Sequence, residues 1–269
     1  MRRNPVVAGQ FYPAEARELR SDVERYIEEG RLLVSEAGAT CRALIVPHAG
    51  YIYSGPVAGS GYACLESLDR SVEWTVAILA PSHHVWFKGA ALPEADEFRT
   101  PLGDVKVAEA AEMLARGQLA FRSTQAHALE HAVEVQVPFL QVALERFTII
   151  PLVLGDVDAE ALARELLGLG LSHLLVVASS DLSHYSPYSE AVDHDHATID
   201  HILKDEGDEL GGEDACGFIP IRTVLALARA SGWKPQLLDY RNSGDTAGDR
   251  SAVVGYAAIA FWEEKHGDE

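Results

Sequence analysis

RALIVP, at residues 42–47, is the first of five short apolar runs that decide the fold. The others are WTVAILA (74–80), FTIIPLVLG (147–155), HLLVVAS (173–179) and AVVGYAAIAF (252–261). Valine, isoleucine and leucine dominate these runs, and polar residues do not alternate with them. Continuous runs of this kind are typical of strands that are covered on both faces. They predict a buried sheet.

Segments with a helical pattern separate the apolar runs. We expect helices at 14–30, 107–117, 127–146, 158–170, 189–205 and 220–232. Alternation of strands and helices predicts an α/β fold with a mixed, largely parallel sheet between helices. No repeat or Pro/Ser-rich linker divides the chain, so we expect residues 1–269 to form a single domain.

Composition excludes several classes of protein. The chain carries 22 basic and 41 acidic side chains, a formal charge of -19, which repels nucleic-acid phosphates. It has no apolar stretch of the roughly 18 to 20 residues that a membrane-spanning helix needs. Three scattered cysteines cannot form a disulfide framework. We therefore expect a cytoplasmic protein that binds neither nucleic acid nor membrane.

Polar clusters follow three of the predicted strands. The clusters contain His48, then His83 and His84, then Asp181 and His184. Ligand sites in open α/β sheets lie outside the carboxyl ends of the strands, so these side chains converge if the three strands are neighbours. Imidazole and carboxylate groups there can form an open metal site. For each histidine taken alone, the alternative is an ordinary surface or turn residue.

Cysteine 216 lies just before the helix expected near Pro220. A position near a helix N-terminus lowers the thiol pKa and favours the thiolate, which binds metals. The alternative is that Cys216 is a small apolar filler in a turn. For Cys41 and Cys64, which have no polar cluster around them, we expect that structural role.

The segment from His127 to His131 matches H-x-x-E-H, the inverted zinc-protease motif, with Glu130 as base. Two histidines one helical turn apart can bind zinc. The match is short in a chain with 11 histidines, so we instead expect a helix that lines the pocket, with His131 or Glu134 in its wall.

A second histidine-rich run, Asp193-His194-Asp195-His196, lies in the helix expected at 189–205. Alternating positions in a helix point to different faces, so these four side chains cannot converge on one metal. We expect a solvated helix face.

Several motifs, in their order along the chain, resemble the MEMO family, also called AmmeMemoRadiSam system protein B. They are NPVVAGQFYP (4–13), PHAGYIYSG (47–55), PSHH (81–84), EHAVEVQVPFL (130–140), FTIIPLVLG (147–155), SSDLSHY (179–185) and CG (216–217). The resemblance covers essentially the whole chain. It implies a fold like that of class III extradiol dioxygenases of the protocatechuate 4,5-dioxygenase type.

The resemblance also implies a site. The family's metal-binding histidines correspond to His48 and His83, and its cysteine to Cys216. Asp181 and His184 match the remaining pocket residues, and we expect both to be catalytic, with His184 as general acid/base and Asp181 orienting it. In the dioxygenases a glutamate replaces this cysteine. Fe(II) is our first expectation for the cofactor. Copper or zinc are the alternatives, because a thiolate is a softer ligand than a carboxylate.

Three functions remain open at this point. The first is a non-haem iron redox enzyme or dioxygenase whose substrate is unknown. An aromatic small molecule is one candidate, with Tyr51, Tyr53, Trp86 and Tyr185 as candidate lining residues. The second is a scaffold protein with a vestigial metal pocket that binds peptides, as phosphotyrosine-binding family members do. The third is a zinc hydrolase. The family's system name also implies a radical SAM protein as partner.

Overall fold

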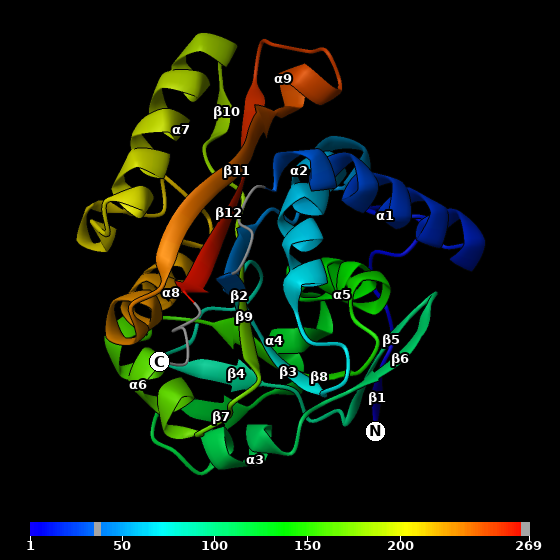
Figure 1. Ribbon diagram of the computed structural model, residues 1–269, viewed down its shortest axis with the longest axis vertical. Coiled ribbons are helices and arrows are strands. Elements are labelled where there is room, and N and C mark those ends of the chain that lie inside the picture. Colours follow the sequence, from blue (N-terminus) through cyan, green and yellow to red (C-terminus); the bar gives the residue numbers. More distant parts are fainter. Residues whose placement is uncertain (35–38, 265–269) are drawn as a thin grey trace.

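One large sheet runs through the computed structural model, which describes residues 1–34 and 39–264. Nine strands of these residues pair in the order β10-β12-β2-β9-β3-β8-β4-β7, with β11 also paired to β12 (Figure 1). They are β2 (Ala39–Val46), β3 (Trp74–Pro81), β4 (Ala90–Leu92), β7 (Ala120–Arg122), β8 (Phe147–Leu154), β9 (Leu174–Ser179), β10 (His184–Ser186), β11 (Lys234–Asn242) and β12 (Val253–Glu264). A small separate sheet joins β1 (Arg2–Arg3), β5 (Glu97–Thr100) and β6 (Gly103–Lys106).

The centre of the large sheet is parallel. Strands β2, β9, β3 and β8 run in one direction, while β12 and β4 flank them in the opposite direction. All six residues of β9 are buried, as expected for a continuous apolar run covered on both faces. The prediction of a mixed, largely parallel α/β sheet is confirmed.

Helices cover both faces of the sheet (Figure 1). They are α1 (Ala16–Gly30), α2 (Tyr51–Tyr62), α3 (Ala110–Ala115), α4 (Thr124–Ala128), α5 (Val137–Ala143), α6 (Ala159–Gly168), α7 (Tyr188–Leu203), α8 (Phe218–Ser231) and α9 (Ser243–Thr246). Short 3₁₀ helices lie at Arg31–Leu33, Ala63–Ser67, Glu134–Gln136 and Gly207–Glu209. None of the described helices is both long enough and apolar enough to cross a membrane.

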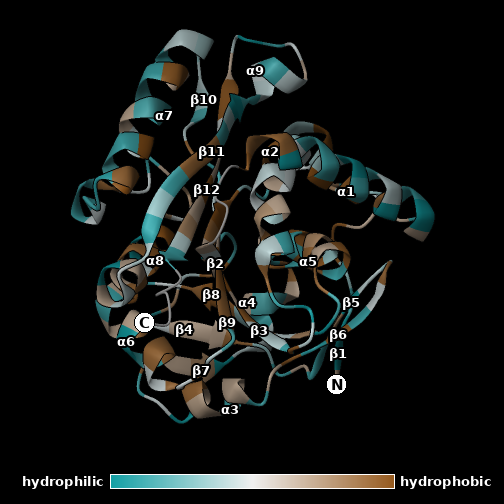
Figure 2. Cartoon of the chain, viewed as in Figure 1, coloured by the Kyte–Doolittle hydropathy of each residue, from teal (hydrophilic) through white to brown (hydrophobic). Residues whose placement is uncertain are grey.

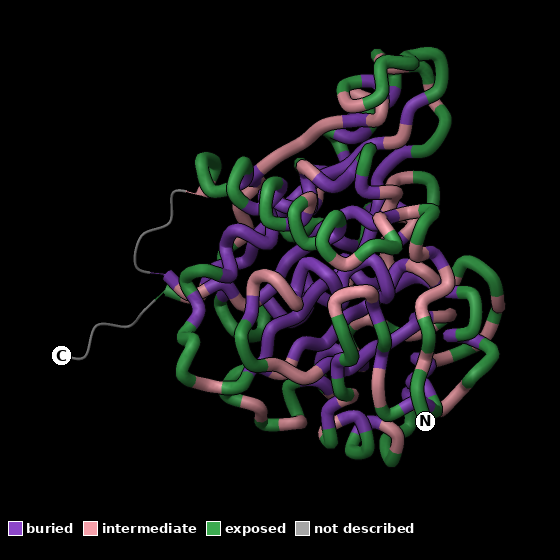
Figure 3. The backbone as a smooth tube through the Cα atoms, turned by 90° about the vertical axis from the view of Figure 1, so that its right-hand side faces the viewer, coloured by how far each residue is buried: buried purple, intermediate pink, exposed green. Residues whose placement is uncertain are grey.

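The alternation of side chains along β2 separates two cores. Leu44 and Val46 pack into the core shared with α1, α2 and α5, whereas Ala43 and Ile45 pack into the core shared with α6, α7 and α8. Successive residues of a strand point to opposite faces, so one apolar run supplies both layers. Figure 2 shows apolar strands between helices with polar outer faces, and Figure 3 shows the same strands as the buried centre.

Helix α2 was not among the predicted helices. Its sequence, YIYSGPVAGSGY, is rich in glycine and has no one-sided apolar pattern, because most of its residues are buried. A Cβ atom at Gly59 would lie 2.3 Å from the backbone oxygen of Tyr26, so this glycine allows α1 and α2 to approach closely. The helix therefore depends on packing rather than on intrinsic propensity.

The single helix predicted at 127–146 is wrong. Helix α4 ends at Ala128, and regular α-helix resumes only at Val137. Between them, the Glu130 side chain accepts a hydrogen bond from the backbone N–H of Ala132, at 3.0 Å. A carboxylate that binds nearby backbone offers the chain an alternative to helical pairing.

Candidate metal centre

The polar clusters after β2, β9 and β3 lie at one edge of the sheet. These strands are direct neighbours and parallel, so their carboxyl ends meet there. His48 follows β2, Asp181 follows β9 and His83 follows β3. The condition on which we predicted convergence is therefore met.

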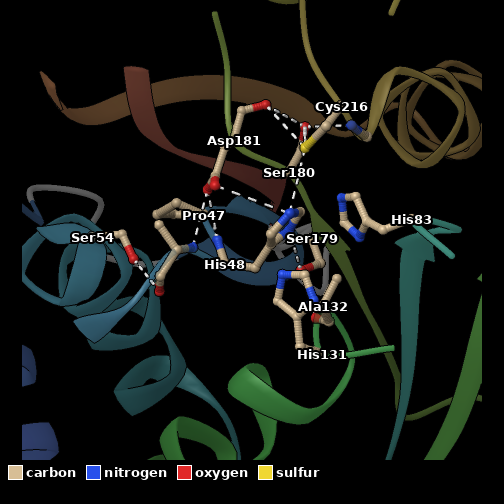
Figure 4. A network of polar contacts seen from close by, with 12 residues as sticks. Pro47, His48, Ser54, His83, His131, Ala132, Ser179, Ser180, Asp181 and Cys216 are labelled. Carbon is tan, nitrogen blue, oxygen red and sulfur yellow. Dashed lines mark hydrogen bonds and ion pairs between the residues drawn. The ribbon is translucent and has the colours of Figure 1, made fainter. Parts of the chain in front are cut away.

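Three potential metal ligands gather at this edge. The ligand atoms of His48, His83 and Cys216 all lie within 4.8 Å of one another. The Cys216 sulfur lies 3.4 Å from Nε2 of His48, and the rings of His48 and His83 are 5.1 Å apart (Figure 4). Cys216 reaches the group from the turn before α8, where the backbone N–H of Gly217 donates to Ser180 Oγ at 2.9 Å.

A chain of hydrogen bonds fixes the tautomer of His48. Gln136 Nε2 donates to the Pro47 carbonyl at 3.0 Å and to Ser179 Oγ at 2.7 Å. The Ser179 hydroxyl donates its one proton to the carbonyl of Ala132, at 2.7 Å. It can only accept from Nδ1 of His48, 3.0 Å away. Nδ1 therefore carries the proton, and the lone pair on Nε2 faces Cys216.

A carboxylate fixes the tautomer of His83. Glu130 Oε1 lies 2.9 Å from Nδ1 of His83, and Oε2 accepts from the backbone N–H of the same residue at 2.8 Å. With Nδ1 donating to the carboxylate, Nε2 is left free. This carboxylate–histidine arrangement is the usual support of a metal-binding imidazole.

Burial sets the charge state of His48 and the neighbouring His131. Burial, followed by the nearby His83, lowers the pKa of His48 to about 3. Burial, followed by the charge of His48, lowers the pKa of His131 to about 4. Both rings are therefore neutral near pH 7, the state in which imidazole binds a metal.

The His83–Glu130 pair behaves differently. Burial disfavours the charged ring of His83, but the hydrogen bond and the charge of Glu130 outweigh it and raise the pKa of His83. Burial of Glu130 is likewise outweighed by His83 and by backbone N–H donors, so its pKa falls to about 2. Glu130 is thus a permanent anion beside His83.

Comparisons with known proteins identify the family of this chain. The family model described as "Memo-like protein" matches residues 3–260. The chain belongs to this family. It is 38% identical to a MEMO1 family protein of Sulfolobus acidocaldarius, in an alignment of 97% of this chain and 99% of the relative. MEMO1 family proteins of Methanosarcina mazei and Methanopyrus kandleri are each 37% identical, over 96% and 97% of this chain and 98% and 99% of their own lengths.

The residues of this Memo-like chain fit a transition-metal ion. Two imidazole nitrogens and one sulfur converge, and the Nδ1 atom of each imidazole is already hydrogen-bonded. Our prediction of a lowered Cys216 pKa is wrong for the metal-free protein. Burial, followed by the charge of Asp181, raises the pKa of Cys216 to about 12. Because a metal binds the thiolate, a cation held there would be bound with loss of this proton.

Asp181 and His184 occupy different parts of the site. Asp181 is buried, and its Oδ1 accepts from the backbone N–H groups of His48 at 2.8 Å and Ala49 at 3.3 Å. Its other oxygen lies 4.0 Å from Nε2 of His48. His184 is exposed at the start of β10, yet its charge influences Asp181 and His48. Asp181 thus orients the His48 loop, and His184 faces solvent beside it.

The two histidines of the H-x-x-E-H segment lie in different places, one in the core and one beside the proposed metal ligands. Nε2 of His127 donates to the Ala91 carbonyl at 2.8 Å, and the ring is buried. His131 lies outside α4 and stacks on His83, with ring centroids 4.9 Å apart. The two histidines therefore do not form the helical zinc pair that the motif requires.

Of the two residues expected in the pocket wall, His131 lies beside the proposed ligands, stacked on His83, and Glu134 lies elsewhere. Glu134 binds Arg3 at 2.7 Å and accepts from Tyr12 and from the backbone N–H groups of Val6 and Val7. It attaches the N-terminal segment instead. His84 is exposed and lines the cavity next to His83 without joining the ligand group.

The run at 193–196 is mostly a solvated helix face, as predicted, with one exception. Asp195 is fully buried, accepts from the Ser183 backbone N–H at 2.9 Å and accepts from the Tyr240 hydroxyl at 2.8 Å. It supports the loop that carries Asp181 and His184. The spacing within the run did not distinguish Asp195 from its neighbours.

Three supporting residues were missed from sequence. Ser179 and Gln136 fix the tautomer of His48, and Glu130 fixes that of His83. For Glu130 the sequence suggested only one role, that of the base in a protease motif. A usable signal was present for Ser179, since it is the last residue of a strand whose neighbouring strand leads to His48.

Proposed function

We propose that the protein binds one transition-metal ion, iron(II) in the first instance, through His48, His83 and Cys216, and is a metal-dependent redox enzyme. The observation that carries the proposal is the convergence of one ligand atom each from His48, His83 and Cys216, all within 4.8 Å of one another. An iron(II) ion held there would supply one-electron redox chemistry and open positions for oxygen or substrate.

The surrounding residues have separate roles in this proposal. Glu130 and Ser179 hold the two imidazoles with Nε2 directed inward. Asp181 holds the loop of His48 through two backbone N–H groups. His184 is the group to which we assign proton transfer, because its exposed ring can exchange protons with solvent while its charge interacts with Asp181.

Anaerobic reconstitution with iron(II) tests the ligand set. We expect about one iron per wild-type chain, and a large loss of affinity in Cys216→Ala, because the sulfur is removed. Cys64→Ala is the matched control, since Cys64 is buried in the core outside the site and should leave binding unchanged. Cobalt(II) provides a second measurement, because its thiolate charge-transfer absorption should be absent only from Cys216→Ala. Equal iron binding by all three proteins would reject the site.

Proton transfer by His184 needs its own test. His184→Gln should retain the iron stoichiometry of the wild type but change the pH profile of iron-dependent oxygen uptake. If oxygen uptake is absent in the iron-loaded wild type, the redox proposal fails while the metal site stands.

Zinc hydrolysis at the same three residues is the second candidate. One thiolate with two neutral imidazoles is a common zinc donor set, and a fourth open position activates water. Elemental analysis of freshly purified protein separates the candidates: one zinc per chain without iron-dependent oxygen uptake favours hydrolysis.

A scaffold function and a radical SAM partner remain proposals of lower rank. Capture of phosphotyrosine peptides needs cationic side chains, and the described residues that line the cavity at the site include no lysine or arginine. Co-purification with a radical SAM protein would test the partnership.

We place the protein in the reducing cytoplasm, in agreement with its three free thiols in the described chain.

A further inference from the structure

A cavity of about 500 Å³ adjoins two of the proposed metal ligands, His83 and Cys216. Its wall is formed by residues 81–86 after β3, residues 154–156 after β8, and residues 216 and 218–220 at the start of α8. A volume of this size accommodates a small organic molecule. The cavity is therefore where a substrate would approach the metal site.

Asp156 carries the unpaired charge of this cavity, because His83, which also lines it, is paired with Glu130. Asp156 is the sole carboxylate among the described residues that line it, and no described lysine or arginine lines it. The backbone of Asp156 is fixed, since it donates to Phe87 and accepts from Gly89. Its side chain forms no hydrogen bond or ion pair with any residue in the described ranges, 1–34 and 39–264. The adjacent Lys88 pairs with it only as a backbone bridge.

The rest of the wall offers apolar surface. Trp86 is 79% exposed, although tryptophan usually hides much of its ring. Phe218 and Ile219 line the same cavity and are only partly buried. An exposed aromatic surface beside a few polar groups is typical of a ligand site.

We propose that this cavity selects a small molecule that joins a planar apolar group to a cationic amine, and that it rejects carboxylates and phosphates. The ring packs on Trp86 and the ammonium group pairs with Asp156. An anion at the same place would face an unpaired carboxylate on a chain of net charge -19. The inference rests on the proposed function in that it takes this ligand to be the substrate class of the metal site.

Three probes with the same ring test the charge preference: 2-phenylethylamine, 2-phenylethanol and 3-phenylpropionate. Binding is followed by NMR titration of the Trp86 indole N–H, assigned from its loss in Trp86→Ala, at about pH 8, where the amine is still charged. We expect the amine to bind about tenfold more tightly than the carboxylate, the order expected when an exposed charge changes from attraction to repulsion.

Variants identify the responsible residue. Asp156→Asn should abolish the preference for the amine and leave the neutral alcohol unchanged. Asp193→Asn, which removes the same charge from the exposed face of α7, should change nothing. No shift with any probe, a preference for the carboxylate, or an amine preference that survives Asp156→Asn would overturn the proposal.

Titrations of both the metal-free and the zinc-loaded protein distinguish a failure of this proposal from a failure of the proposed function. Loss of charge preference in a protein that still binds metal rejects only the ligand class. Failure to bind metal rejects the proposed function, while the metal-free titration still measures the selectivity of the cavity.

Discussion

His48 and His83 direct equivalent nitrogens into one site from different surroundings. His48 is enclosed by the sheet and the 132–136 segment, with 3% of its side chain accessible, and its partner is a neutral hydroxyl. His83 has 28% of its side chain accessible, faces the cavity, and is held by the carboxylate of Glu130. Burial lowers the pKa of His48, whereas Glu130 raises the pKa of His83.

The difference shows two ways of fixing an imidazole tautomer. In the His48 region the core excludes the charged ring, so a neutral hydrogen-bond chain is sufficient. In the His83 region solvent can reach the ring, and a permanent anion is needed to hold the proton on Nδ1. The His83 region should therefore depend on a single side chain, and the His48 region on many contacts.

The largest effect is expected from Glu130→Gln. The amide oxygen of the glutamine can still accept a hydrogen bond from Nδ1 of His83. Its NH₂ group, however, then faces the backbone N–H of His83, which donates to Glu130 Oε2 in the wild type. Misplacing His83 should weaken zinc or iron binding by about 10- to 100-fold. Competition with a chelator measures it. Glu145→Gln, an exposed glutamate, is the control, and wild-type affinity in Glu130→Gln would show that His83 does not need its anion.

His127 shows how burial alone changes the pKa of a histidine, because it is not one of the proposed metal ligands. Burial lowers its pKa to about 4 from an ordinary value near 6.5, as burial does for His48. Between these pH values the unfolded chain binds a proton that the folded chain does not, so stability falls as the pH drops from 6.5 to about 4. From pH 7 to 5 this amounts to roughly 2 kcal/mol for one group.

His127→Gln keeps a donor for the Ala91 carbonyl but cannot titrate in this range. Denaturant unfolding at several pH values should show a shallower loss of stability on acidification than in wild type. His84→Gln, at an exposed ring, should keep the wild-type slope. The same slope in all three proteins would mean that burial does not hold His127 neutral.

The smallest effect on metal affinity is expected from Ser179→Ala. It removes the acceptor of His48 Nδ1–H and of Gln136, but the core still encloses the ring. We expect a few-fold loss of metal affinity and about 1 to 3 kcal/mol less stability, from buried groups left unpaired. Ser60→Ala, at another buried serine, controls for the loss of a core hydroxyl. An effect larger than that of Glu130→Gln would reverse the comparison.

The five apolar runs predicted five of the strands, β2, β3, β8, β9 and β12, since a buried strand needs apolar residues on both faces. The polar residues after β2, β3 and β9 predicted the edge at which a site would lie. Local patterns were sufficient for these features because strand burial and strand ends are determined within a few residues.

Other features were decided only by tertiary structure. Helix α2 forms because Gly59 allows contact with Tyr26, and β11, with polar residues such as Asp239, is a strand because β12 offers its backbone. His127 and His131 lie four positions apart, yet one enters the core and the other the pocket, because Glu130 interrupts the helix between them.

The chemistry of the site was likewise predicted only in part from the sequence. Histidine and cysteine as residue types, with the family resemblance, identified His48, His83 and Cys216 from sequence. Their protonation depends on distant partners: Ser179 is 131 positions from His48, and Glu130 is 47 positions from His83. Burial raised the pKa of Cys216, although its place near a helix start had predicted the reverse. Solvent exclusion and long-range hydrogen bonds arise only when the chain is folded, so no local pattern could reveal them.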